Sequence, residues 1–292
     1  MNKEQIALLY VIFGAVVMTV LGISFALLTD SDAILLDALF NLVTLIMSLL
    51  TLKVARLIKQ GSSAKFQFGY YGFEPMLNMT KGSIILVLCL IAGVDSLLVI
   101  LSGGKPLDTG LAAIYAITAT IICFVTASIL RHFRKQLHSP LVELESFNWL
   151  VNGVISAGIA VTFLFAYFIQ SSKWNFIVPY IDPAIVILLV LLVIKIPFEI
   201  ITDSFNQLLG AAPQPELEQQ LKTELTTVLA EHNLKVFDTQ MMLSGRLLYI
   251  KLQVRFTGSF GLTSDKMLDE IQSSIKVSAK KLHPDIQIDL VL

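Results

Sequence analysis

Residues 6–28 read IALLYVIFGAVVMTVLGISFALL, an apolar run without one charged side chain. A helix rises about 1.5 Å per residue, so about 20 apolar residues are enough to cross the hydrocarbon core of a bilayer. The run is longer than the apolar segment of a signal peptide, and no clear small-residue cleavage pattern follows it. We therefore expect it to be the first membrane-spanning helix.

Further along the chain, five more runs are long and apolar enough to span a membrane. Of the 292 residues, 55% are hydrophobic and only 15% are charged, which is too apolar for an ordinary soluble surface. We therefore predict an all-α bundle of six membrane-spanning helices, and we expect membrane lipid to surround it. The six predicted spans are 6–28, 33–57, 76–102, 110–130, 144–169 and 177–207.

Basic residues are distributed unequally between the two ends of these predicted helices. One set of connections holds Lys53, Arg56, Lys59, Lys65, Arg131, Arg134 and Lys135, whereas the opposite set holds only Lys105 and Lys173. Cytoplasmic connections of membrane proteins carry an excess of Lys and Arg. The sequence therefore predicts that both termini are cytoplasmic. If the protein is bacterial, we expect it in the plasma (inner) membrane.

The composition changes after Gly210-Ala-Ala-Pro213, where apolar runs give way to charged, helix-forming residues. We predict a transmembrane domain over 1–209 and a small cytoplasmic α+β domain over 210–292. The second domain is expected to have the order α-β-β-α-β. Its helices are predicted at 214–232 and 263–282, and its strands at 235–243, 247–256 and 286–291.

Several classes of function find no support in the sequence. The formal net charge is −1 and the 21 basic residues are spread along the chain, so we expect no nucleic-acid partner. Cys89 and Cys123 lie singly in apolar runs, which indicates neither a disulfide framework nor a thiolate metal site. No nucleophile-base pair, HExxH motif or phosphate loop is present, so we expect no enzymatic activity and no cofactor.

Two of the predicted helices carry polar side chains at helical spacing. Asp37 and Asn41 lie one turn apart in the second helix, and the fifth helix carries Glu145, Asn148, Asn152 and Ser156 on one face. Four side-chain oxygens from two such helices can converge on one cation. The asparagines could instead only hydrogen-bond between helices, whereas an unpaired carboxylate in lipid is a costly way to join helices.

The predicted helix ends place these polar pairs at different depths. At 1.5 Å per residue, Asp37 and Asn41 fall toward the outer leaflet, whereas Asn148 and Asn152 fall toward the inner leaflet. A cation site that uses all four residues therefore requires the two helices to be offset along the membrane normal.

Other charges lie near the cytoplasmic ends of the third and sixth helices. Lys81 is at a depth similar to that of Glu199 and Asp203, which predicts an interhelical ion pair that locks the helices together. Pro197 lies between Lys195 and Glu199 and should kink the sixth helix, because proline removes a backbone hydrogen bond.

Several motifs, taken in order along the chain, resemble those of the cation diffusion facilitator (cation efflux) family. They are Ser31-Asp-Ala-Ile-Leu-Leu-Asp-Ala-Leu-Phe-Asn41, Phe68-Gly-Tyr-Tyr-Gly-Phe-Glu-Pro75, Asn148-Trp-Leu-Val-Asn152, Ile181-Asp-Pro183 and Leu208-Leu-Gly-Ala-Ala-Pro213. The resemblance implies a homodimer that exports divalent metals from the cytoplasm in exchange for protons, by alternating access. It also implies a ferredoxin-like cytoplasmic domain through which two subunits pair.

Carried over residue by residue, the resemblance implies a metal site formed by Asp37, Asn41, Asn148 and Asn152, to which Glu145 could add a second carboxylate. Family members usually have carboxylates or histidine at most of these positions, whereas this chain has one carboxylate and three amides. Oxygen donors without histidine or thiolate favour manganese, iron(II) or magnesium over zinc, and a monovalent cation also fits. Proton exchange would then depend on Asp37 and Glu145.

The scarcity of charge at this site supports a second hypothesis, in which a degenerate family member serves as a membrane-anchored interaction or regulatory subunit. The cytoplasmic domain also departs from the family, because Asp289 stands where a metal-binding histidine is frequent. We expect its two histidines, His232 and His283, to be ordinary surface residues. Dimerisation can persist without metals in that domain.

Overall fold

The computed structural model describes residues 3–137, 140–231, 234–256, 265–280, 282–283 and 285–291. In this part of the chain, six helical segments are long and apolar enough to cross a membrane. The predicted membrane bundle is therefore confirmed by length and composition. The candidate spans are Leu9–Thr29, Asp32–Lys59, Phe73–Leu101, Thr109–Phe133, Glu145–Ile169 and Asn175–Leu208.

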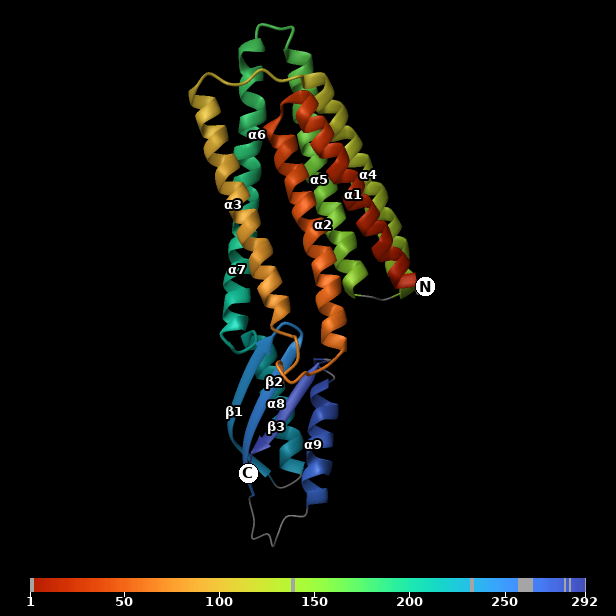
Figure 1. Cartoon of the computed structure of the whole chain (residues 1–292), viewed down its shortest axis with the longest axis vertical. Helices are drawn as coiled ribbons and strands as arrows, with labels where there is room; N and C mark the ends of the chain where they lie inside the picture. Colours follow the sequence, from red (N-terminus) through yellow and green to blue (C-terminus); the bar gives the residue numbers. More distant parts are fainter. Residues whose placement is uncertain are drawn as a thin grey trace. The chain divides into compact units, whose positions relative to one another are not determined.

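The helices are labelled in chain order in Figure 1, and the chain divides into two compact units that cut across them. One unit comprises Met1–Leu49 and Lys81–Phe198, and the other comprises Leu50–Thr80 and Glu199–Leu292. The boundary predicted between residues 209 and 210 stays a prediction. The helices up to this point are α1 Lys3–Thr29, α2 Asp32–Lys59, α3 Phe73–Leu101, α4 Thr109–Leu137, α5 Pro140–Ile169, the 3-10 helix η1 Asn175–Ile177, α6 Val178–Val193 and α7 Lys195–Leu208.

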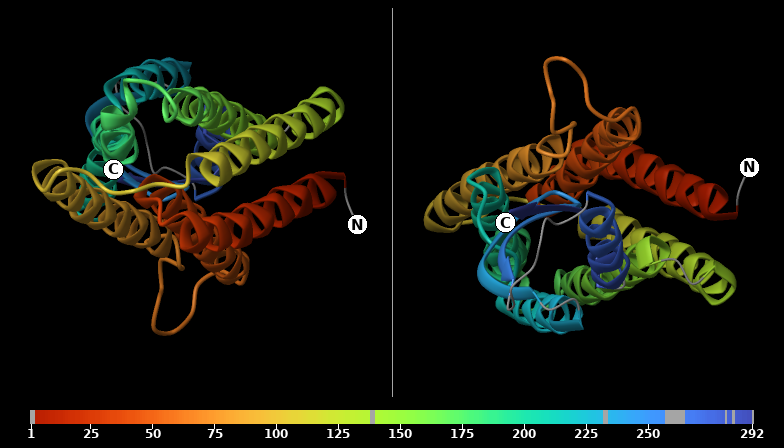
Figure 2. Two further views of the ribbon diagram at one scale, coloured as in Figure 1. Left: turned by 90° about the horizontal axis from the view of Figure 1, so that it is seen from above. Right: turned by 90° about the horizontal axis from the view of Figure 1, so that it is seen from below.

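Small side chains allow close packing in the first unit. Helices α4 and α5 run side by side, and α1 lies against α4 (Figure 2). The buried face of α4 carries mostly alanines, which let neighbouring helix backbones approach closely. These residues are Ala112, Ala113, Ala116, Ala119 and Ala127.

The sixth spanning segment is interrupted where the proline predicts a kink. Helix α6 ends at Val193 and α7 begins at Lys195. Pro197 has no N–H to donate to the carbonyl of Val193, and its ring crowds that carbonyl. The predicted single helix over 177–207 is therefore two helices.

The second unit contains a three-stranded sheet in the order β1-β2-β3. Its elements are α8 Pro215–Glu231, β1 Leu234–Ser244, β2 Leu247–Phe256, α9 Asp265–Lys280 and β3 Ile286–Val291, in the predicted order α-β-β-α-β. Strand β2 pairs antiparallel with β1 and parallel with β3. A parallel pair needs a crossover connection, and α9 supplies it.

Both helices of this α+β unit cover the same face of the sheet. Alternate residues of β2, from Leu248 to Val254, are buried against α8 and α9 in one hydrophobic cluster. The ferredoxin-like pattern β-α-β-β-α-β has four strands, whereas the described part of this domain has the last five of those six elements. The ferredoxin-like description therefore remains a prediction.

An ion pair joins the first turn of α3 to the hairpin between β1 and β2, within the second unit. Glu74 Oε1 accepts hydrogen bonds from the Arg246 guanidinium, with Nε at 2.8 Å, and Glu74 Oε2 accepts one from the Arg246 backbone N–H at 2.9 Å. The turn residue Gly245 has φ of +57°, and a Cβ there would lie 2.6 Å from Glu74 Oε2. Glycine is therefore required for this close approach.

Candidate functional site

The carboxylate of Asp37 lies inside the helix bundle, where its hydrogen-bond donor is a tyrosine from another helix. The Tyr115 hydroxyl of α4 donates to Asp37 Oδ2 at 2.6 Å. Tyr115 is only 4% exposed, and its ring lies 5.7 Å from that of Phe25. A buried tyrosine usually needs a partner for its hydroxyl, and Asp37 provides one.

A small cavity adjoins this pair of residues. It is lined by Ala33, Ile34, Asp37, Tyr115, Ala116, Ala119, Ser156 and Ile159. Its volume of about 10 Å³ is close to the room that one water molecule needs. The polar groups on this lining are a carboxylate and two hydroxyls, which are oxygen donors of the kind that hard cations prefer.

The residue of α5 that reaches the level of Asp37 is Ser156, rather than an asparagine. Ser156 is 7% exposed and lines the cavity. Asn152 lies one turn further toward the N-terminal end of α5 and Asn148 two turns further, and both side chains are exposed. The polar face of α5 therefore changes from buried at Ser156 to accessible at Asn152 and Asn148.

The sequence predicts that the polar residues of α2 and α5 lie at different depths. An offset of α5 relative to α2 along the bundle removes only part of this difference. Asn41 and Asn152 each lie about 6 Å inward from the level of the cavity, by the rise of a helix. The Asn41 amide donates to the Asp37 backbone carbonyl at 2.9 Å. The structure thus brings Asp37 to Ser156 and Asn41 to the level of Asn152, but it does not bring Asn148 to the level of Asp37.

Glu145 lies further still toward the N-terminal end of α5. Its charge interacts with that of Lys81 in α3. Along the helix, Glu145 is about 16 Å from Ser156, which is many times the length of a metal–oxygen bond. Glu145 and Asp37 therefore do not reach one ion in this arrangement. The predicted pairing of Lys81 with Glu199 or Asp203 stays a prediction.

Where α2 begins, the buried carboxylate of Asp182 has a structural role. Asp182 of α6 accepts hydrogen bonds from the Ser31 hydroxyl at 2.5 Å and from the Asp32 backbone N–H at 2.8 Å. These groups belong to the start of α2, whose first N–H groups lack partners within the helix. Asp182 therefore caps α2 and fixes the helix that carries Asp37.

The connection between α3 and α4 adds a charge cluster next to this cap. Lys105 Nζ lies 3.2 Å from a carboxylate oxygen of Asp30 and 3.2 Å from one of Asp32. Burial lowers the pKa of Lys105, but the hydrogen bonds and charges of the two aspartates outweigh burial and raise it. The single ammonium group offsets one of the two negative charges, so the cluster is an ion-pair network with one carboxylate in excess.

Among all the described residues, in the helix bundle as in the C-terminal α+β domain, no group of three His, Cys, Asp or Glu side chains is placed to hold a metal. His283 is half-buried rather than a surface residue, and its Nδ1 has no hydrogen-bond partner among the described residues. The prediction for His232 falls on a residue outside the described ones. Asp289 is exposed and accepts a hydrogen bond from the Tyr249 hydroxyl.

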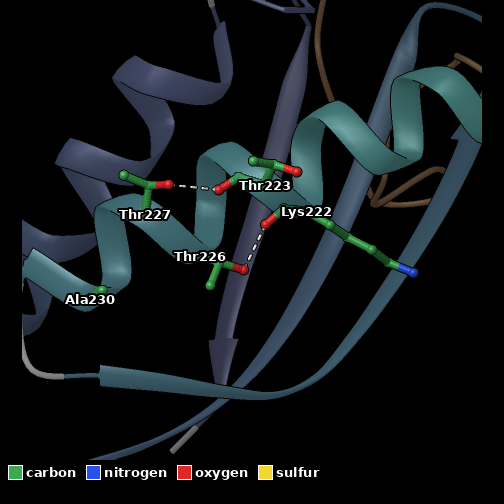
Figure 3. A pocket seen from close by; sticks show the side chains of 5 residues that line it. All are labelled: Lys222, Thr223, Thr226, Thr227 and Ala230. Atoms are coloured by element: carbon green, nitrogen blue, oxygen red, sulfur yellow. Dashed lines mark hydrogen bonds between the residues drawn. The ribbon is translucent and has the colours of Figure 1, made fainter.

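A shallow hollow on α8 offers no ligand chemistry of its own (Figure 3). Its threonine hydroxyls donate back to their own helix: Thr226 donates to the Lys222 carbonyl at 2.6 Å and Thr227 to the Thr223 carbonyl at 2.9 Å. These hydroxyl protons are therefore committed to the helix backbone.

The residues missed by sequence reasoning are Tyr115 and the capping Asp182. The signal for Tyr115 was a single hydroxyl-bearing aromatic residue on an alanine-rich face, which needs a partner once it is buried. Ser156 was recognised as part of the polar face of α5, but it was not assigned to the site.

The helix bundle matches a known family of membrane domains. The family model of the cation efflux transmembrane domain matches residues 8–209. No curated protein matches the chain. The matched residues include Asp37, Tyr115 and Ser156, so the cavity lies within the matched domain.

Proposed function

The chain belongs to the cation efflux (cation diffusion facilitator) family, and we propose that it is a secondary-active transporter that moves a divalent metal ion out of the cytoplasm in exchange for protons. At the coarser level it is a membrane protein that transports metal cations. The finer proposal is carried by one observation, the half-buried carboxylate of Asp37 beside a small cavity whose lining includes the hydroxyl residues Tyr115 and Ser156.

The ion class follows from the donor atoms. Asp37, Tyr115 and Ser156 present only oxygens to the cavity, and the asparagines of the polar faces add only amide groups. Oxygen donors favour manganese, iron(II) and magnesium, whereas zinc binds well to histidine and thiolate. We therefore expect a hard divalent ion as the substrate.

The path of the ion is proposed from the exposure of the polar residues. Asn148 and Asn152 are exposed on the side of the cavity that we propose faces the cytoplasm, and Ser156 is buried. An ion would enter from the cytoplasm along these amides and lose water as it reaches Asp37. Alternating access would then open the outer side, and the break between α6 and α7 supplies a candidate hinge.

Proton exchange is assigned to the carboxylates of this path. Asp37 would take up a proton when the ion leaves, and Glu145 is the second candidate. We further propose a homodimer that pairs through the cytoplasmic domain, with both termini in the cytoplasm and no enzymatic activity.

The proposal is tested with inverted membrane vesicles, whose outer surface is the cytoplasmic face. Vesicles that contain the protein should accumulate Mn²⁺, Fe²⁺ or Mg²⁺ in preference to Zn²⁺ when respiration acidifies their interior. An uncoupler should abolish the accumulation. Accumulation equal to that of vesicles without the protein, for every ion of the panel, would rule out the proposed transport.

Because the site has few charged side chains, we also consider an alternative function as an interaction or regulatory subunit. Asn148 and Asn152 are neutral and exposed, as they would be in a family member that binds a partner subunit and transports no divalent metal. Metal flux through the purified protein alone decides against this alternative.

A further inference from the structure

The cavity beside Asp37 is lined by a set of oxygen donors that differs from the four residues implied by the family resemblance. It holds Tyr115 from α4 and Ser156 from α5, whereas Asn148 and Asn152 do not line it. Both hydroxyl residues are almost fully buried, at 4% and 7% exposure. The cavity is therefore a small, partly open and mostly apolar hollow between three helices, with one carboxylate and two hydroxyl residues on its lining.

Asp37 is poorly satisfied in this position. Among the hydrogen bonds of the described residues, its carboxylate accepts one, from Tyr115. A carboxylate in an apolar interior requires a counter-charge or several donors. The alanines of the lining leave room for about one water-sized species. A bound species of that size could be the further partner that the Asp37 carboxylate requires.

The Tyr115 hydroxyl can bind a cation without giving up its hydrogen bond to Asp37. A phenol has one proton to donate and lone pairs to offer, so its proton can remain on Asp37 Oδ2 while a lone pair faces the ion. The other carboxylate oxygen and the Ser156 hydroxyl complete three ligands from three helices. Water and the amides one turn inward are available for the rest of the shell.

We propose that Tyr115 and Ser156 are direct ligands of the transported cation together with Asp37. This inference rests on the proposed function and names the ligands of that same site. Because the three donors come from three helices, ion binding draws α2, α4 and α5 together. The shell carries one negative charge and only oxygen donors, which gives it a preference for a small hard cation.

A gain of function tests the Ser156 ligand. In a Cys123→Ala background, which removes the thiol hydrogen-bonded to Ser156, Ser156→Cys places one soft sulfur donor at the cavity. Cd²⁺ affinity of the full chain in lipid nanodiscs should rise at least tenfold, because thiolates select soft ions. The control is Ser128→Cys in the same background, since Ser128 lies on the exposed side of α4.

A loss of one oxygen tests the Tyr115 ligand. Tyr115→Phe should weaken Mn²⁺ binding, measured by electron paramagnetic resonance, by at least about tenfold. Tyr167→Phe makes the same change at an exposed position of α5 and should leave Mn²⁺ binding within twofold. Unchanged Mn²⁺ affinity in Tyr115→Phe, or equal Cd²⁺ affinity of the two cysteine variants, would overturn the ligand assignment.

Wild-type transport separates this inference from the function on which it rests. If the wild type accumulates Mn²⁺ in vesicles and both ligand variants bind metal like their controls, the ligand assignment is wrong and the transporter stands. If the wild type neither binds nor accumulates any divalent ion, the proposed function is wrong, and the ligand assignment falls with it.

Discussion

Removal of the Arg246 side chain should uncouple the β1–β2 hairpin from the first turn of α3. Hydrogen bonding to Glu74 raises the pKa of Arg246 above its usual value, so the guanidinium remains charged under all ordinary conditions. The side chain of Glu74 is 14% exposed and that of Arg246 is 43% exposed. The pair is therefore intermediate in exposure between a surface ion pair and a buried one. Arg246→Ala leaves Glu74 with only the backbone N–H as its donor in this pair.

The expected magnitude follows from the two guanidinium hydrogen bonds. Hydrogen bonds to charged groups contribute about 1.5–3 kcal/mol each, but exposed ion pairs contribute only about 0–1 kcal/mol. Solvent screening of the half-exposed Arg246 therefore reduces the coupling to about 2 kcal/mol. At about 2–4 °C per kcal/mol for a domain of roughly 150–250 residues, the unfolding midpoint should fall by about 4–8 °C.

A double-mutant cycle measures this coupling. Glu74→Gln, Arg246→Ala and the double variant are heated in the same detergent at one scan rate, and the midpoint is read by differential scanning calorimetry. The unfolding midpoint of the double variant should be no lower than that of the less stable single variant. Lys222→Ala is the control, because it removes an exposed pair with Glu218 and should change the midpoint by less than about 1–2 °C. Single-variant effects that simply add would refute the coupling.

Three further predictions concern the first unit. Gly22→Ala would place a Cβ 2.7 Å from Ala38 Cβ and 3.1 Å from Tyr115 Oη, so it should cost about 1–3 kcal/mol of stability, measured as a lower unfolding midpoint; an unchanged midpoint would contradict the close packing of α1 on α2. Asp182→Ala removes the acceptor of the Ser31 hydroxyl and should cost about 2–3 kcal/mol of stability, measured as a lower unfolding midpoint. One kcal/mol corresponds to about 2–4 °C, so a midpoint within about 1 °C of the wild type would show that the cap is unimportant. Lys105→Met should lower the midpoint by the same amount at each pH between about 5, which is above the ordinary aspartate pKa, and about 10.4, the ordinary lysine pKa. The raised pKa of Lys105 means that this difference shrinks only as the pH rises above that value, and a difference that vanished near pH 7 would contradict the ion pairs.

The spanning helices were predictable because each depends on a property that is local in sequence. Length and hydropathy suffice to identify a span, and Pro197 alone predicts the break between α6 and α7. The elements of the C-terminal α+β domain were predictable for the same reason, since alternate burial along β2 repeats the alternation of its apolar residues.

The site was only partly predictable, because it depends on the register between helices that are far apart in sequence. Asp37 and the polar face of α5 could be found from spacing, but which α5 residue faces Asp37 depends on how far α5 extends beyond α2. That offset places Ser156 beside the cavity and Asn148 two turns away. Tyr115 could not be paired with Asp37 from spacing, because hydropathy gives no information on which faces of α2 and α4 meet.

The structural role of Asp182 was hidden for a similar reason. A carboxylate at the start of a spanning helix is compatible with both ion binding and capping, and the sequence does not show its partners. Its hydrogen bonds to Ser31 and Asp32 assign it to the cap of α2.

The most direct test of the account is metal flux into liposomes that contain only the purified protein. Wild-type protein should carry Mn²⁺ against an empty-liposome background, and Asp37→Asn should reduce the flux to that background. Asp95→Asn makes the same change at an exposed position of α3 and should retain the wild-type flux. Wild-type flux in the Asp37→Asn protein would contradict the central claim that metal crosses the membrane through the carboxylate of Asp37.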